Sequence, residues 1–128
     1  MGAEGIRAYI PQANSTFIAG GTITKGIAVK PDSTAGQVVA AGAGERAIGI
    51  ANMDSSLGKT VTVTMLGGTE ATAGAAIATI MSPLVVTTGG KLIAATTDKD
   101  KIVGFSVGVA GADGDIIPVI VVPSVISA

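Results

Sequence analysis

The side chains that could carry out chemistry are few in this chain, and two reactive kinds are missing. Its 128 residues include neither histidine nor cysteine, so the usual base at neutral pH and the best nucleophile are both absent. A serine–lysine pair or two carboxylates would remain for catalysis. The nine acidic residues fall mostly in expected turns, and none is expected to be desolvated: Glu4, Asp32, Glu45, Asp54, Glu70, Asp98, Asp100, Asp113 and Asp115. The sequence therefore predicts no catalytic residue, no cofactor, no metal site and no enzyme.

Gly58-Lys59-Thr60 matches the end of a phosphate-binding loop. That motif also requires a glycine five residues before Gly58, where this chain has Met53. It further requires a strand before the loop and a helix after it, so that backbone N–H groups can hold phosphate. Because Gly58 stands between two expected strands, the sequence favours a hairpin turn.

Two other short motifs have simpler interpretations. Thr97-Asp98-Lys99 is similar to the hairpin that presents the modified lysine in lipoyl domains. No glutamate precedes this threonine, however, and Asp100 replaces the small residue after the lysine, which favours a solvated turn. Gly42-Ala43-Gly44 is a fragment of a dinucleotide-binding loop without the helix that should follow it.

The composition indicates one domain with little charge. Charged residues make up 13% of the chain, against about 25% in an average soluble domain. Apolar residues reach 48%, but there are only two Phe, one Tyr and no Trp, so the core must consist of Val, Ile and Ala. Much of the surface is then neutral or apolar, and such surface usually contacts other chains. We therefore expect an obligate assembly.

The charge pattern argues against nucleic acid and membranes as partners. The net charge is −1 and no basic block is present, whereas nucleic-acid binding needs a positive surface. Glu4 and Arg7 interrupt any early apolar run that could serve as a signal peptide. The longest apolar run, Ile116–Val122, is too short to cross a bilayer. We expect a soluble protein.

An internal repeat organises the chain. The segment Gly36–Leu66 returns as Gly90–Val122, with an offset of 54 at the opening glycine. The offset is 55 at Gly49 and Gly104, the second residues of two apolar quartets, and 56 through the closing strands. Insertions in loops with strands kept in step are typical of a duplicated β-unit. We expect an all-β fold, a small barrel or sandwich with internal pseudo-twofold symmetry.

The closing strands of the two copies differ on one face. In Thr60–Leu66, Val61, Val63 and Met65 alternate with outward-facing threonines. Ile116–Val122 keeps the inward set, but its other face is apolar. A strand that is apolar on both faces should be covered on both, which predicts a subunit interface at Ile116, Pro118, Ile120 and Val122. The alternative is an internal central strand, but Pro118 cannot donate to a β-ladder.

The mid-strand glycines and the N-terminus complete the expected layout. Gly49 and Gly104 indicate a bulge or a close backbone approach in a tightly curled sheet. Ile6, Ala8 and Ile10 alternate until Pro11, and the polar Gln12–Thr16 that follows is loop-like. We expect an extended N-terminal arm over residues 1–18, followed by one β domain over 19–128 made of units at about 19–68 and 73–124.

The repeated quartets resemble the capsid cement (head decoration) proteins of tailed bacteriophages. In that family a Val/Ile-Gly-Val-Ala strand, a small-residue loop and a Val-x-Val strand recur twice per chain. The first pass here is Ile48-Gly49-Ile50-Ala51, a loop with Gly58, and Val61-x-Val63. The second is Val103-Gly104-Phe105-Ser106, Ala110–Gly114 and Ile117-x-Val119, which departs from the pattern at Phe105-Ser106. The match runs from about Ala19 to Val122.

The resemblance implies a non-catalytic virion protein with a small β-barrel or β-tulip fold. Such proteins form homotrimers, bind the outer surface of the assembled capsid and stabilise it, so the implied partners are the major capsid protein and further copies of this chain. Synthesis would occur in the host cytoplasm. As a hypothesis, the arm docks on the major capsid protein through Ile6, Arg7, Tyr9 and Phe17, and the C-terminal strand helps to close the trimer.

Two alternatives remain from the sequence. One is a ligand-binding or carrier β-domain, either lipoyl-like or carbohydrate-binding. Sugar binding normally needs exposed aromatic residues, and Tyr9, Phe17 and Phe105 are few, while an acylated Lys99 would favour a carrier. The other alternative is a β-module of a fibre or tail.

Overall fold

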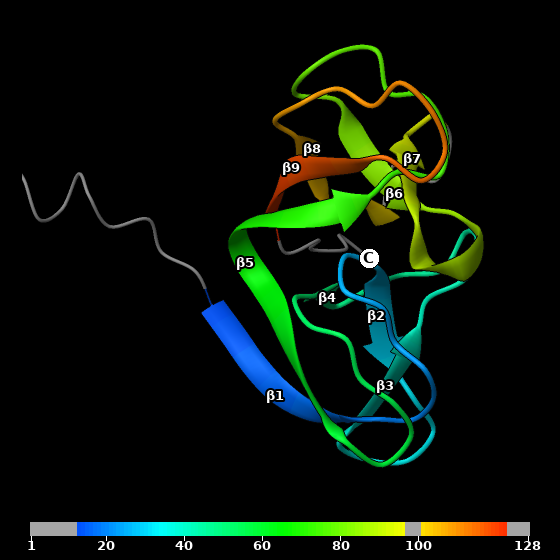
Figure 1. Cartoon of the computed structure of the whole chain (residues 1–128), viewed down its shortest axis with the longest axis vertical. Coiled ribbons are helices and arrows are strands. Elements are labelled where there is room, and N and C mark those ends of the chain that lie inside the picture. The colour runs from blue at the N-terminus through cyan, green and yellow to red at the C-terminus, as the bar shows by residue number, and fades with distance from the viewer. Residues whose placement is uncertain (1–12, 97–100, 123–128) are drawn as a thin grey trace, which may run out of the picture.

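Strands make up almost all of the regular structure. The computed structural model describes residues 13–96 and 101–122, and the all-β prediction is confirmed (Figure 1). The strands are β1 (Ala13–Ala19), β2 (Ala28–Pro31), β3 (Gln37–Ala40), β4 (Gly49–Ala51), β5 (Thr60–Thr72), β6 (Pro83–Val86), β7 (Leu92–Ala94), β8 (Gly104–Ser106) and β9 (Ile116–Val121). One turn of 3-10 helix, η1 (Thr88–Gly90), precedes β7.

The strands form two small closed rings that share β5. In the first ring β1 pairs with β3, β3 with β2, β2 with β4, β4 with β5, and β5 again with β1. In the second ring the other half of β5 pairs with β9, followed by β8, β6 and β7. A parallel bridge between Ala73 and Leu92 closes this ring. We call the first ring, with residues 60–66 of β5, the N-half, and the second ring, with residues 67–72 of β5, the C-half. In Figure 1 the N-half is the lower part of the molecule and the C-half is the upper part.

The strand registers of the two halves repeat with the offsets seen in the sequence. Val29 pairs with Ala40 in the N-half, and Leu84 pairs with Ala94 in the C-half. The quartet strands behave alike: Ile50 faces Thr64, and Phe105 faces Ile120. The two halves are therefore two copies of one fold.

The register also shows where the first copy begins. Phe17 of β1 pairs with Val61, and Ala71 of β5 pairs with Ile117, so β1 corresponds to the second half of β5. Residues 13–18, which the sequence assigned to the arm and partly to a polar loop, lie in β1. Four of them are exposed, because β1 gains its place through backbone pairing with β5 and needs no apolar face. Residues 1–12 lie outside the described part of the chain.

Each half has its own core, and the cores meet at the junction. The N-half core contains Ile23, Val29 and Val61, among others, while Met65 and Phe17 pack against it. The C-half core contains the corresponding Ile77, Leu84 and Ile117, and it also takes in residues of the N-half: Ala28, Ala41 and Ile50. The shared strand and these junction residues hold the halves together.

The closing strands of the two copies follow the predicted alternation with one exception. Val61, Val63, Ile117 and Val119 are buried as expected. Thr64, predicted to face outward, is fully buried, and its hydroxyl oxygen accepts a hydrogen bond from Asn52 Nδ2 at 3.3 Å. A threonine tolerates this position because its polar atom has a partner.

Candidate interaction surface

The acidic residues of the described segments serve turns and ion pairs. Asp54 Oδ1 accepts the backbone N–H of Lys25 at 2.7 Å, and Asp115 Oδ2 accepts the N–H groups of Gly111 and Ala112. Asp113 pairs with Lys91 at 2.9 Å. Within residues 13–96 and 101–122, no three possible metal ligands gather in one place.

The carboxylate of Glu45 accepts two hydrogen bonds at the Gly42–Glu45 turn. Lys30 Nζ donates to Glu45 Oε2 at 2.7 Å, and the Gly42 N–H donates to Glu45 Oε1 at 2.6 Å. The hydrogen bond from Lys30 lowers the pKa of Glu45 most, and the hydrogen bond from the Gly42 N–H lowers it further. Partial desolvation of the carboxylate acts in the opposite direction and raises this pKa, but the net shift is downward. The arrangement stabilises the Gly42–Glu45 turn, because the carboxylate accepts from both sides.

The short glycine motifs lie in turns. Gly58 adopts φ 82° and leads directly into β5, so no helix follows it and the phosphate-loop interpretation is excluded. Gly44 has φ 73°, and its carbonyl accepts Lys101 Nζ at 2.8 Å, which links the two halves. Residues 97–99, the lipoyl-like motif, lie outside the described residues. No helix in the described segments is long and apolar enough to span a bilayer.

Within residues 13–96 and 101–122, no segment covers the outward face of β9, which is apolar. Ile117, Val119 and Val121 point into the C-half core, and the intervening residues are exposed. Ile116 exposes 62% of its surface. The residues predicted to form an interface therefore share one free face: Ile116, Pro118, Ile120 and Val122.

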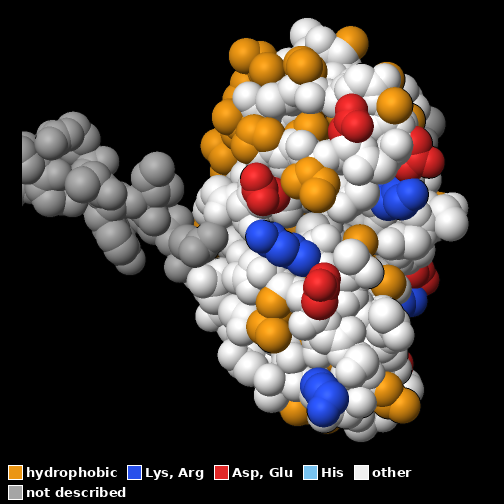
Figure 2. All heavy atoms as spheres, in the orientation of Figure 1, with side chains coloured by type: hydrophobic (Ala, Val, Ile, Leu, Met, Phe, Trp, Pro, Cys, Tyr) orange, Lys and Arg blue, Asp and Glu red, His pale blue; other side chains and the backbone are white. Residues whose placement is uncertain are grey.

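The C-half exposes further apolar residues, which the sequence did not predict. They lie in the β5–β6 and β8–β9 connections, and the Val107 N–H donates to the Pro118 carbonyl at 2.8 Å. The resulting set, here called the C-half apolar face, consists of Ile80, Met81, Val107, Val109, Ile116, Pro118, Ile120 and Val122. Figure 2 shows hydrophobic side chains gathered over the half that contains β6–β9.

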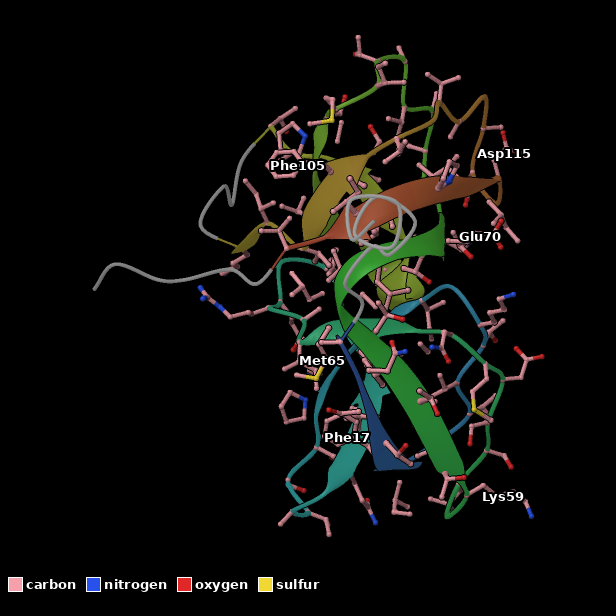
Figure 3. The ribbon with its side chains drawn as sticks, turned by 90° about the vertical axis from the view of Figure 1, so that its left-hand side faces the viewer. Phe17, Lys59, Met65, Glu70, Phe105 and Asp115 are labelled. Carbon is pink, nitrogen blue, oxygen red and sulfur yellow. The ribbon has the colours of Figure 1, made fainter. Side chains whose placement is uncertain are left out.

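A shallow groove of about 480 Å³ runs across this face. Its lining is almost entirely apolar, and Glu70 stands at its margin, 3.9 Å from Lys25. Its wall is formed by β5, β9 and the start of the β8–β9 loop: Gly67, Gly68, Thr69, Glu70, Val107, Pro118, Val119 and Ile120. Gly68 leaves the groove open because no atom lies within 4 Å of the position that a Cβ would take. Glu70 and Asp115, both labelled in Figure 3, belong to the C-half.

Of the residues predicted for the arm, the structure describes only Phe17. Ile6, Arg7 and Tyr9 fall in residues 1–12, outside the described part. Phe17 lies in β1 and packs, half-buried, against the N-half core (Figure 3). The arm joins the domain where Ala13 pairs with Leu66, one residue from the point at which β5 changes partners.

Comparison with known proteins extends this description of the fold. No protein-family model matches the sequence, and no curated protein matches it either. Among solved structures, the chain is similar to the head fiber gp8.5 N base of bacteriophage phi29, with a TM-score of 0.67 at 18% sequence identity. The match covers 92% of this chain and 100% of that one. The chain thus shares its fold, over nearly its whole length, with a protein from the head fibre of a phage.

Proposed function

We propose that this chain is a non-catalytic structural protein of a phage virion, located on the outside of the head. The observation that carries the proposal is the shared fold with a phage head fibre base, which extends over 92% of this chain. The uncovered apolar face of the C-half supports it, since a protein of an assembly needs such a surface. The tandem quartets, which resemble capsid cement proteins, point to the same class.

In the more specific form of this proposal, the protein is a cement protein that binds the major capsid protein, forms a homotrimer and stabilises the shell. The arm would contact the capsid through Ile6, Arg7 and Tyr9. It leaves the domain at Ala13, beside the junction of the halves, and twelve extended residues can reach about 40 Å. Many weak contacts repeated by symmetry would then strengthen the shell through effective concentration.

A second candidate is the base of a head fibre. A solved structure with the shared fold is a head fibre base, and the match covers all of that chain. In that case the domain would anchor a further fibre protein and would add little to the stability of the shell.

The test is to mix the purified protein with expanded heads of the parent phage that lack it. We expect saturable binding by co-sedimentation, and no binding would contradict the proposal. For a cement protein, electron cryomicroscopy should show density at the three-fold positions, and the heads should withstand a higher temperature. A fibre base should bind without changing the temperature at which the heads break.

Deletion of residues 1–12 tests the arm separately. This deletion ends before β1, so the domain should fold and keep its circular dichroism spectrum. We expect capsid binding to be lost. Deletion of residues 123–128 is the matched control, because that segment leaves the domain after β9, whose Val121 pairs with Gly67 at the same junction. Unchanged binding after the first deletion would refute the role of the arm.

A further inference from the structure

The groove of the C-half begins where the N-terminal arm joins the domain. Ala13, the first described residue, pairs with Leu66, and the next residue of β5, Gly67, is part of the groove wall. Since β1 and β5 are antiparallel, β1 starts at the end of residues 60–66 that adjoins this wall (Figure 1). The arm and the groove therefore share one end of the C-half.

The length of the arm matches the length of the groove. The wall along β5 is formed by Gly67–Glu70, which spans about 13 Å at the rise of an extended strand. Ile10 and Tyr9 precede Ala13 by three and four residues, so an extended chain places them about 10–14 Å from it. The large apolar side chains of the arm that are nearest to the domain thus reach the groove.

The other terminal segment starts in the wrong direction. β9 is antiparallel to the second part of β5, so it passes Glu70 at Pro118 and reaches Gly67 at Val121. A chain that continues the direction of β9 leaves the groove at Gly67. Residues 123–128 are therefore less suited to fill it than residues 1–12.

The N-half shows that the fold does not require apolar residues in this place. The same backbone hydrogen bond runs from Asn52 N–H to Thr62 O and from Val107 N–H to Pro118 O. Val107 and Pro118, both exposed in the groove wall, thus stand where the first copy has polar residues. Apolar side chains that a fold leaves exposed without needing them indicate a contact.

The glycine of the groove supports the same conclusion. Asn14 pairs with Thr64 and Gly68 pairs with Ile120, and the repeat offset of 56 relates Thr64 to Ile120. The N-half therefore carries an asparagine side chain where the C-half has Gly68. The backbone of Gly68 is outside the left-handed region, so its conformation does not demand glycine. This glycine instead leaves room for another segment of chain.

We infer that residues 1–12 of the same chain cover the groove in the free protein, with Tyr9 and Ile10 lying over Gly68, Val107 and Pro118. The consequence of this contact rests on the proposed function. When the arm binds the capsid, it leaves the groove and bares an apolar surface only on the head, where a partner can cover it. Covering the groove until then protects the free protein from non-specific association.

A single fluorophore reports on the arm. Tyr9 is the only tyrosine of the chain, which has no tryptophan, so quenching of tyrosine fluorescence by acrylamide measures how accessible the arm is. The triple variant Gly68→Asn, Val107→Asn, Pro118→Thr gives the groove the residues that the N-half already accommodates. The matched control is Leu57→Asn, which changes an exposed apolar residue of the N-half. The test needs no capsid, so its failure is distinct from a failure of co-sedimentation with heads.

We expect Tyr9 to be quenched several-fold less in the wild-type and control proteins than in the triple variant. The triple variant should match a synthetic peptide of residues 1–12. The wild-type value should be the same in dilute and in concentrated protein, because the arm belongs to the same chain. Equal quenching of the wild type and the peptide would overturn the inference. Protection that appears only at high concentration would also overturn it, since the arm of a neighbouring copy would then fill the groove.

A second readout applies if the triple variant does not fold. The chain contains no cysteine, so Ile10→Cys with Val107→Cys introduces one pair of thiols, one in the arm and one in the groove. Mild oxidation should join them within one chain, because a disulfide forms where two Cα atoms come within about 7 Å. Ile10→Cys with Leu57→Cys is the control and should stay unlinked. Equal linking of both pairs, no linking of the first pair, or linking between two chains would contradict the inference.

Discussion

Gly104 lies so close to the carbonyl oxygen of Ile120 that a Cβ on Gly104 would collide with it. Gly49 has the same relationship to the carbonyl oxygen of Thr64 in the other half. Both glycines are buried at the start of the quartet strands, where β4 meets β5 and β8 meets β9. The close backbone approach expected from the sequence is therefore present twice, and it lets each short strand curl tightly into its ring.

Gly104→Ala and Gly49→Ala should each destabilise the protein. A methyl group at either position must push two paired strands apart, and overpacking of this kind costs about 1–3 kcal/mol of the free energy of unfolding. Urea denaturation followed by circular dichroism measures the change.

Gly21→Ala is the control for these two variants. No atom lies within 4 Å of a Cβ on Gly21, and its backbone is outside the left-handed region, so the free energy of unfolding should change by less than about 0.5 kcal/mol. If Gly104→Ala were as stable as this control, the close approach would not be a structural requirement.

The repeat explains why much of the fold could be predicted. Strand pairing depends on period-2 alternation, and Val61 and Val63 show it as clearly as Ile117 and Val119 do. The offsets of 54, 55 and 56 in the sequence return as the register of the paired strands. Since both copies had to satisfy the same pattern, each confirmed the interpretation of the other.

The missed features depend on contacts that no local pattern records. β1 is held by backbone pairing along β5, so its exposed polar residues looked like a loop. Thr64 is buried through a hydrogen bond with Asn52, twelve residues earlier. Ile80, Met81 and Val109 come from connections between strands, and only the folded ring brings them into the same half as β9. The repeat offset of 55 matches Ile80 to the polar Lys25 of the first copy. This change from a polar to an apolar residue was the signal in the sequence that could have identified these exposed residues.

Ser106 positions one part of the C-half apolar face. It is fully buried, its hydroxyl accepts the Ser82 N–H at 3.0 Å, and it donates to the Thr79 carbonyl at 3.1 Å. These bonds hold the loop that presents Met81. Ser106→Ala leaves the partly buried N–H of Ser82 without this partner and should cost about 1–3 kcal/mol of the free energy of unfolding. Ser106→Thr, which keeps the hydroxyl, is the conservative control, and equal stability of Ser106→Ala and wild type would contradict the role.

Met81→Gly should separate folding from association. Met81 has φ 61°, in the left-handed region. Glycine adopts this conformation without the strain of about 1–2 kcal/mol that a side chain adds there, although the unfolded chain becomes more flexible. We expect a free energy of unfolding of the monomer, measured in the Ile116→Thr, Ile120→Thr background, that is unchanged or slightly higher. In the otherwise wild-type chain, Met81→Gly should weaken self-association in light scattering. A large loss of monomer stability would show that Met81 serves the fold instead.

The hydrogen bonds of Glu45 predict a specific dependence of stability on pH. Its pKa in the folded protein is lowered by Lys30 and by the Gly42 N–H, so the stabilisation is complete above the unfolded pKa of about 4.3. It is lost as the pH falls through the folded pKa, because folding then no longer favours the charged carboxylate. Glu45→Gln should lower the melting temperature at pH 7 slightly, and this difference should shrink and vanish on acidification.

Glu70→Gln is the matched control, since Glu70 is exposed and its distance to Lys25 is 3.9 Å. A difference between Glu45→Gln and wild type that grows below pH 4 would contradict the sign of this coupling.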